Sequence, residues 1–287
     1  MTKSDNVSAV QNLVIRDRVF GITVVCALIV GGLMVSLGPS PQEEESQQSH
    51  HVSSSGPMPD FERFNSVKEK KRAFISFLLP KVEEVNSKII DERMQLQKYA
   101  LRLESGRSLS SSQQRKLARL AASYDVDADA MLSWDLVQKL MRRIDIVPPS
   151  LVISQSATES AWGTSRFARE GYNLFGIWCF TPGCGIVPGR RIEGADHEVA
   201  VYDSPEDALE NYIHILNTHP AYREFRDLRE TLRQKDDALD GTVLAEGLSR
   251  YSERGDEYVE ELRFMMRINN MTRFDAPEAG EPVSAVP

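Results

Sequence analysis

The sequence predicts a mainly helical α+β domain with one small β-hairpin, preceded by a single N-terminal transmembrane helix. Three observations support this fold class. Apolar residues recur at helical spacing through most of residues 60–274. Only two segments have the pattern of strands, and residues 19–37 carry no charge at all. Because strands and helices do not alternate, the sequence argues against a parallel α/β sheet.

The uncharged segment "VFGITVVCALIVGGLMVSL" at 19–37 covers most of a hydrocarbon core about 30 Å thick. Arg16 and Arg18 precede it, whereas no Lys or Arg follows until Arg63. Because basic residues favour the cytoplasmic side, we expect residues 1–18 to form a short cytoplasmic tail and the rest to be exported. A cleaved signal peptide is the alternative, but the long apolar run and the lack of an A-x-A-like site favour an uncleaved anchor.

Two further segments are too polar and too rich in Pro, Ser and Glu to bury a core. We expect residues 38–59 to be a disordered linker and residues 275–287 a disordered tail, which leaves 60–274 as the folded domain. The predicted location is therefore the inner membrane, crossed once, with the domain in the periplasm. If the N-terminus is cleaved, the domain is secreted to the periplasm.

The charge balance argues against a nucleic-acid-binding protein. The net charge is −8, with 41% hydrophobic and 26% charged residues, as in ordinary globular domains. Lys68, Lys70, Lys71 and Arg72 cluster locally, but acidic residues such as Glu69 alternate with them. We interpret this cluster as a solvated helix face.

The helices are expected in the following order. The segment 67–106 has helical periodicity, interrupted at Pro80, where proline is expected to kink or break the helix. Two short amphipathic helices follow within 111–126 and 127–144. A more apolar helix, "SLVISQSATESAWG", is predicted to be capped by Ser150 and closed by Gly163.

The strand candidates and the last helices complete the domain. The segments "NLFGIWCF" (173–180) and "HEVAVYD" (197–203) are predicted to pair as a hairpin, with a turn-rich segment between them. Helix resumes at "SPEDALENYIHILN", where Ser204 and Asp207 have the spacing of a capping box. Residues 241–270 are expected to close the domain as helix.

Glu159 ends the apolar helix among aromatic residues. A carboxyl group beside Trp162 and near Phe175 and Trp178 is partly desolvated, and desolvation raises its pKa. A carboxylic acid that keeps its proton near neutral pH can protonate the leaving oxygen in glycosidic bond cleavage. The flat faces of Trp162 and Trp178 suit sugar rings. Spacing alone also fits a helix-ending Glu beside core aromatics.

The segment "ATESAWGTSRFAREGYNLFGIW" resembles the signature of the glucosaminidases of glycoside hydrolase family 73, which runs E-S-x-W-G-x-S, a short helix, then N-L-F-G-I. The matching positions are Glu159, Ser160, Trp162, Gly163, Ser165, Asn173, Leu174, Phe175, Gly176 and Ile177. The continuation "CFTPGCGIVPGRR" and the preceding helices resemble the bacterial Bax proteins, a branch of the same superfamily, over roughly residues 66–272. The resemblance implies a lysozyme-like fold and cleavage of the β-1,4 bond of peptidoglycan after N-acetylglucosamine, with Glu159 as general acid.

The resemblance also implies further site residues. The family places a second carboxylate in the hairpin after the signature, where Glu193, Asp196 and Glu198 are candidates; we favour Glu193, which lies in the Gly-rich loop. The segment "YSERGDEY" resembles a late family motif, Y-x-T-D-x-x-Y, although it is one residue longer. It makes Tyr251 a catalytic candidate, with a Tyr in a helix joint as the alternative. The predicted substrate contacts are Trp162, Asn173, Phe175, Trp178 and Tyr202.

Cys179 and Cys184 lie close together in a domain that we expect to be exported, and an oxidising compartment favours a disulfide between them. Free thiols and a zinc site that includes His197 are the alternatives, and zinc lacks an obvious fourth ligand. We predict no metal and no cofactor.

The leading functional hypothesis is a membrane-tethered hydrolase, an endo-β-N-acetylglucosaminidase, whose partners are peptidoglycan glycan strands and, through its N-terminal helix, the inner membrane. A lytic transglycosylase also uses one Glu, but "NLFGIW" stands where a Gly-Leu-Met-Gln type of segment is expected. The third hypothesis is a non-catalytic glycan-binding scaffold. The sequence indicates no particular protein partner.

Overall fold

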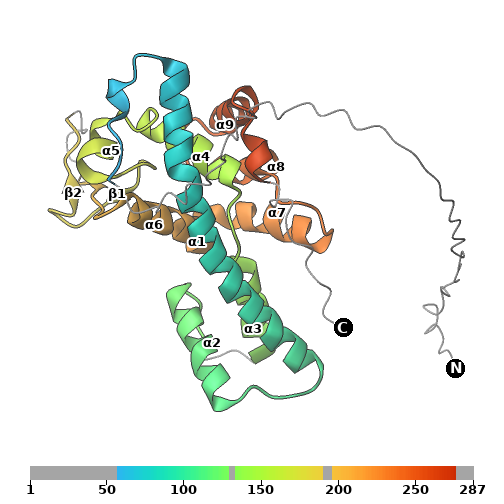
Figure 1. Ribbon diagram of the computed structural model, residues 1–287. Helices are drawn as coiled ribbons and strands as arrows, with labels where there is room; N and C mark the ends of the chain where they lie inside the picture. Colours follow the sequence, from blue (N-terminus) through green and yellow to red (C-terminus); the bar gives the residue numbers. More distant parts are fainter. Residues whose placement is uncertain (1–56, 129–132, 190–195, 276–287) are drawn as a thin grey trace, which may run out of the picture. The chain divides into compact units, whose positions relative to one another are not determined.

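The computed structural model describes residues 57–128, 133–189 and 196–275 of the chain. These residues are mainly helical and include one small sheet (Figure 1). The α-helices are α1 (Val67–Glu104), α2 (Ser111–Ser123), α3 (Ser133–Arg143), α4 (Pro149–Ser160), α5 (Arg166–Gly171), α6 (Pro205–Thr218), α7 (Arg223–Gln234), α8 (Gly241–Leu244) and α9 (Asp256–Ile268). The 3-10 helices are η1 (Phe61–Arg63), η2 (Pro220–Tyr222), η3 (Ala245–Leu248) and η4 (Met271–Phe274).

The long helix α1 contacts α3, α4 and α6 (Figure 1). It runs unbroken through Pro80, so the predicted interruption there is wrong. A proline inside a helix costs about 3 kcal/mol. The neighbouring Leu78 and Val82 are fully buried, and each such side chain contributes about 1.5–3 kcal/mol. Packing on both sides of Pro80 therefore outweighs the local preference of the proline.

Helix α4 lies in the core: within it only Thr158 and Glu159 are not buried. The predicted cap at Ser150 is wrong, because Pro148 is the N-cap and Ser150 lies inside the helix. The backbone N–H and the hydroxyl of Ser150 instead donate to the carboxylate of Asp275, at 2.8 and 2.5 Å. The predicted boundary of the C-terminal tail is therefore wrong by one residue, because Asp275 belongs to the folded domain.

The sheet has three strands, β1 (Trp178–Cys179), β2 (Gly185–Ile186) and β3 (Glu198–Ala200), in the order β1-β3-β2 with both pairs antiparallel. The predicted two-stranded hairpin is therefore incomplete. The missed strand β2 has only two residues and lies in a turn-rich segment. It approaches β3 so closely that a Cβ at Gly185 would stand 2.0 Å from the carbonyl oxygen of Val199. Only glycine fits there.

The predicted anchor at 19–37 lies outside the described residues, as do the N-terminal tail, residues 38–56 of the linker and residues 276–287 of the tail. Within 57–128, 133–189 and 196–275, no helix combines the length and the apolar character needed to cross a membrane.

A buried ionic cluster around Asp145 ties α1, α3 and α7 together. Its carboxylate is 3% exposed and accepts hydrogen bonds from Arg233 at 2.8 and 3.0 Å, with Arg93 at 3.4 Å. Arg229, also buried, donates to the backbone carbonyls of Asp145 and Ile146. Burial alone would raise the pKa of Asp145, but the bond from Arg233 and the charges of Arg229 and Arg93 outweigh burial and lower this pKa.

Replacing the buried carboxylate should destabilise the fold strongly. We expect Asp145→Asn to lower the unfolding free energy at pH 7 by about 3–5 kcal/mol, because it leaves buried arginines without their counter-ion. Urea unfolding measures this loss. The control, Glu260→Gln, removes an exposed ion pair to Arg263 and should lose less than about 1 kcal/mol.

The same carboxylate predicts a pH dependence. Because its folded pKa is lowered, its stabilisation is complete above the unfolded pKa and is lost as the pH falls through the folded pKa. The wild-type and Asp145→Asn unfolding curves should therefore converge in acid. Equal stability of the two proteins at pH 7 would contradict this account of the cluster.

Candidate active site

The turn that ends α4 has an unusual backbone. Ala161, Trp162 and Gly163 are consecutive residues with positive φ, at 51°, 61° and 77°. A left-handed conformation costs roughly 1–2 kcal/mol for a non-glycine residue, so surrounding contacts must hold this turn in place. The turn ends α4 at Ser160, one residue after Glu159, so that the carboxyl group lies in the last turn of a mostly buried helix.

Ser160 supplies the hydrogen bonds that hold the turn. Its buried hydroxyl donates to the carbonyl oxygen of Ser156 at 2.6 Å and accepts from the N–H of Gly163 at 2.8 Å. Its own carbonyl oxygen accepts from the N–H of Ser165 at 2.9 Å. Ser165 in turn caps the start of α5. The serines of the E-S-x-W-G-x-S pattern thus have structural roles around the glutamate.

Trp162 packs against α1. Its ring meets Phe74 edge-on, with centroids 5.7 Å apart, and the ammonium group of Lys71 lies 4.8 Å from the ring centroid. These contacts alone can explain why a tryptophan stands at this position, without a bound ligand. The substrate contact that we predicted for Trp162 stays a prediction.

The Glu159 carboxylate is half-buried, and Tyr258, near the start of α9, holds it. The Tyr258 hydroxyl donates to Oε1 of Glu159 at 2.8 Å. Gly176 lies against the other oxygen: a Cβ there would stand 3.1 Å from Oε2, and its φ of +67° also favours glycine. The hydrogen bond from Tyr258 therefore holds one carboxylate oxygen of Glu159, and the absence of a side chain at Gly176 leaves room for the other.

A buried chain of hydrogen bonds supports Tyr258. Gln155 lies one turn before Glu159 on α4, and its Nε2 donates to the Tyr258 hydroxyl at 3.0 Å. The Tyr212 hydroxyl of α6 donates to Oε1 of Gln155. Each group donates toward the carboxylate, so α4, α6 and α9 together orient Glu159.

The surroundings shift the pKa of Glu159 upward. Burial is the largest cause and raises this pKa, while the hydrogen bond from Tyr258 and the charge of Arg254 oppose it. Burial, followed by the Glu159 charge, also raises the pKa of Tyr222 to about 12. The tyrosines around the site therefore keep their protons at neutral pH and act as hydrogen-bond donors. Burial moves the pKa of Glu159 upward, toward the working range of a general acid.

The predicted residues of the N-L-F-G-I segment form the wall behind Glu159. Asn173 is 2% exposed, and its amide bonds the backbone of Ile177 and Ala200. Phe175 is fully buried and stacks on Tyr212, with ring centroids 4.1 Å apart. Neither side chain offers surface to a sugar in this conformation. The structure gives both residues a positioning role, and the direct substrate contact that we predicted for them stays a prediction.

The other two predicted substrate contacts have accessible side chains. Trp178 is 54% exposed, and its ring stacks on His197 at a centroid distance of 3.9 Å. Phe180, which was not among the predicted contacts, lies two residues further along the chain and is 72% exposed. Tyr202 is half-buried, and its hydroxyl accepts from Asn211 at 2.7 Å. Burial raises the pKa of Tyr202.

Tyr251, the predicted catalytic tyrosine, does not bond Glu159. Its hydroxyl donates to the carbonyl oxygen of Phe175 at 2.6 Å, and its ring stacks parallel to Tyr258 at 5.8 Å. Tyr258, the last residue of the same sequence motif, makes the contact with the carboxylate. The sequence pattern did not reveal the roles of Tyr258 and Gln155, although Gln155 lies four residues before Glu159, on the same helical face.

The structure separates the candidates for the second carboxylate. Glu193 lies outside the described residues, and Asp196 is exposed. Glu198 is buried, and its two oxygens accept from the N–H groups of Gly183 and Gly185 at 3.0 and 2.8 Å. The carboxylate of Glu198 therefore holds the 179–185 loop in place.

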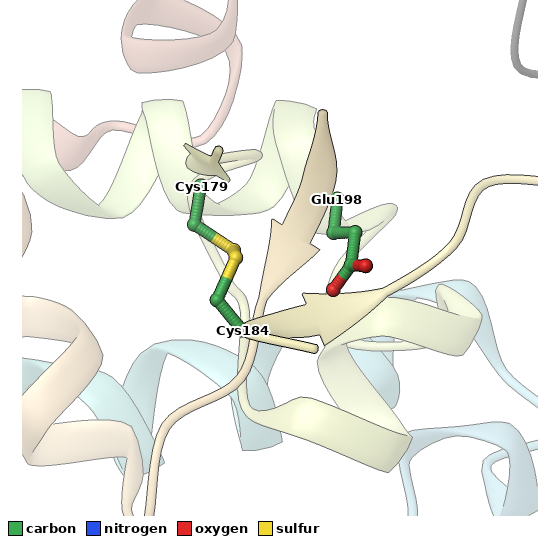
Figure 2. Close-up of side chains that lie close together, drawn as sticks. All are labelled: Cys179, Cys184 and Glu198. Carbon is green, nitrogen blue, oxygen red and sulfur yellow. A yellow bond between two sulfur atoms is a disulfide. The ribbon is translucent and has the colours of Figure 1, made fainter. Parts of the chain in front are cut away.

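Cys179 and Cys184 are joined by a disulfide, the pairing that the sequence favoured (Figure 2). Together with Glu198 they form a group whose ligand-type atoms lie within 4.8 Å of one another. Because both sulfurs are in the disulfide, they offer no thiolate to a metal ion. The loop is thus fixed twice, by the disulfide and by Glu198.

Comparisons with known proteins identify a matching family and similar proteins. The profile of the Glucosaminidase family, described as mannosyl-glycoprotein endo-beta-N-acetylglucosaminidase, matches residues 134–271. Protein bax of Escherichia coli (strain K12) is 31% identical over 233 residues, which is 80% of each chain. Peptidoglycan hydrolase FlgJ of Salmonella typhimurium is 29% identical over 144 residues, covering 42% of this chain and 45% of FlgJ.

Among solved structures, the catalytic domain of the autolysin Auto from Listeria monocytogenes is similar, with 22% identity and a TM-score of 0.35. The similarity covers 58% of this chain and 89% of that domain.

The turn after Glu159 should not tolerate a side chain at Gly163. A Cβ there would stand 2.5 Å from the buried ring of Phe61. The matched control is Gly106, whose φ of +73° is similar but which has nothing within 4 Å of its Cβ position. Gly106→Ala should lose about 1–2 kcal/mol of unfolding free energy through strain alone. Gly163→Ala should lose a further 1–3 kcal/mol, roughly, through overpacking. Equal losses in urea unfolding would refute the packing role of this glycine.

Proposed function

The chain belongs to the glucosaminidase family, and on that premise we propose that it is a glycoside hydrolase that cleaves peptidoglycan, with Glu159 as the general acid. The observation that carries the proposal is the half-buried carboxyl group with a raised pKa and a hydrogen bond from Tyr258. The name of the relative FlgJ, a peptidoglycan hydrolase, supports the substrate class. We also propose that the domain has the lysozyme-like architecture that the family resemblance implies.

The proposed reaction begins with protonated Glu159. Its proton passes to the leaving oxygen as the glycosidic C–O bond breaks and the sugar ring acquires oxocarbenium character. A water molecule then adds to the sugar carbon and gives up a proton to a carboxylate, which completes the hydrolysis. Tyr258 keeps Oε1 occupied by a hydrogen bond, which orients the carboxyl group. The exposed ring of Trp178 provides an apolar face on which a sugar ring can stack.

We propose that the second carboxylate comes from the loop after β2, with Glu193 favoured over Asp196. Glu198 is a weaker candidate, because two backbone N–H groups already occupy its oxygens. The bond cleaved is proposed to be the β-1,4 linkage after N-acetylglucosamine, as in an endo-β-N-acetylglucosaminidase. We propose that the segment 19–37 anchors the chain in the inner membrane, with the domain in the periplasm.

Replacing the acid should abolish cleavage. We expect Glu159→Gln to reduce the rate of peptidoglycan digestion by about 10²- to 10⁴-fold, the usual contribution of general acid catalysis. The control is Glu170→Gln, which removes an exposed glutamate paired with Arg166 and should leave the rate unchanged.

Mass analysis of the new chain ends identifies the reaction. Reducing N-acetylglucosamine ends are expected; anhydro-muramyl ends would assign a transglycosylase instead. Wild-type digestion by Glu159→Gln, or no digestion by the wild-type protein, would refute the proposed acid or the proposed activity.

The bond from Tyr258 predicts the pH profile of the reaction. A general acid must be protonated, so the rate should fall as the pH rises through the pKa of Glu159. Because the hydrogen bond from Tyr258 lowers this pKa, Tyr258→Phe should move the falling limb to higher pH. Tyr251→Phe removes a neighbouring hydroxyl that bonds Phe175 and should leave the limb in place. If only Tyr251→Phe shifts the falling limb, this account of Tyr258 is wrong and the predicted catalytic role of Tyr251 is favoured.

A further inference from the structure

A basic groove of about 680 Å³ lies between the first turns of α1 and the segment from Asn269 to Phe274. Apolar side chains, among them Ile75 and Leu79, form part of its lining. Its charged lining residues are all cationic: Lys68, Lys71, Arg72 and Arg273. In a chain with a net charge of −8, a groove without acidic lining residues is a local exception.

The four cations have no acidic partner among the described residues. Lys71 donates to the side-chain oxygen of Asn269 at 3.1 Å, and Arg273 donates to the carbonyl oxygen of Asn270 at 2.8 Å. Both bonds hold the cations at the groove while leaving their charge uncompensated. The groove therefore has the electrostatic character of an anion-binding surface.

Helix stability does not explain this arrangement. The N-terminus of an α-helix carries a partial positive charge, which favours acidic side chains and disfavours basic ones by about 0.3–1 kcal/mol each. Lys68 lies in the first turn of α1, and Lys71 and Arg72 follow within the next. The solvated helix face that the sequence indicated is therefore an incomplete description, because these cations line a concave surface.

The groove connects physically to the Glu159 site. Lys71 contacts the ring of Trp162, three residues after Glu159. Along α9, Tyr258 and Asn269 lie 11 positions apart, which corresponds to about 16 Å of helix. A peptide of four or five residues spans about 13–18 Å when extended. The separation thus matches a short peptide that branches from a sugar chain.

We propose that this groove binds the carboxylates of the peptide stem of peptidoglycan while the glycan strand lies at Glu159. The inference rests on the proposed function for its substrate class. The apolar walls fit the aliphatic parts of such a stem, and the four cations fit its free carboxylates. A stem held in this way orients the strand and gives the site a preference for peptide-bearing glycan.

Binding measured without cleavage tests the proposal. The full chain carrying Glu159→Gln is titrated with intact peptidoglycan strands and with strands whose stems an amidase has removed. We expect intact strands to bind about tenfold more tightly, through charge complementarity. This preference should weaken as salt rises, because exposed charges are screened.

Two double variants locate the effect. Lys68→Glu with Arg72→Glu should bring the two affinities within about twofold of each other, because the groove then repels carboxylates. The control, Lys116→Glu with Arg119→Glu, makes the same charge change on exposed positions of α2 and should keep the preference. An intact preference in the groove variant, or its equal loss in the control, overturns the proposal.

Two further outcomes separate the alternatives. Micelles containing phosphatidylglycerol serve as the lipid probe: if the groove variant loses only this binding, the groove is a membrane contact and the proposal is wrong. Stem-dependent binding together with no cleavage by the wild-type protein would keep the groove assignment and refute the hydrolase assignment. The two proposals can therefore fail separately.

Discussion

The site depends on one constraint, the abrupt end of a buried helix. Helix α4 is enclosed along nearly its whole length, and three successive left-handed residues, from Ala161 to Gly163, end it just after Glu159. Ser160 fixes this turn from inside, and Phe61 closes over Gly163. This turn lets the chain fold back beside Glu159. The carboxyl group is therefore half-buried, and the backbone of Gly176 can approach it closely.

Around that helix end, the fold balances two opposing electrostatic effects. Burial raises the pKa of Glu159, whereas the hydrogen bond from Tyr258 stabilises the charged form and moderates the increase. The chain of donors from Tyr212 through Gln155 fixes the direction of that bond. Helices α6 and α9 thus contribute to the chemistry of a residue on α4, and the rigid cluster at Asp145 secures the helices α1, α3 and α7.

Local pattern predicted much of this structure. The helices, the capping role of Ser204, the disulfide and the position of Glu159 all follow from spacing, because neighbouring residues determine them. The failures involve partners distant in sequence. Pro80 is tolerated because packing outweighs its local preference, and Asp275 reaches Ser150 across 125 positions. Asn173 and Phe175 match a functional signature, yet the structure uses them to build the wall behind the site. In the sequence, Tyr258 appears only as the last residue of a motif, and the catalytic role was assigned to the first tyrosine of that motif, Tyr251.

The most direct test of the central claim is a titration of the Glu159 carboxyl group by ¹³C NMR in the wild-type protein. The signal is assigned by its absence in Glu159→Gln. The account predicts a pKa above the ordinary value of 4.5, since burial outweighs the bond from Tyr258. A pKa at or below 4.5 would contradict it, because burial would then not outweigh the hydrogen bond from Tyr258.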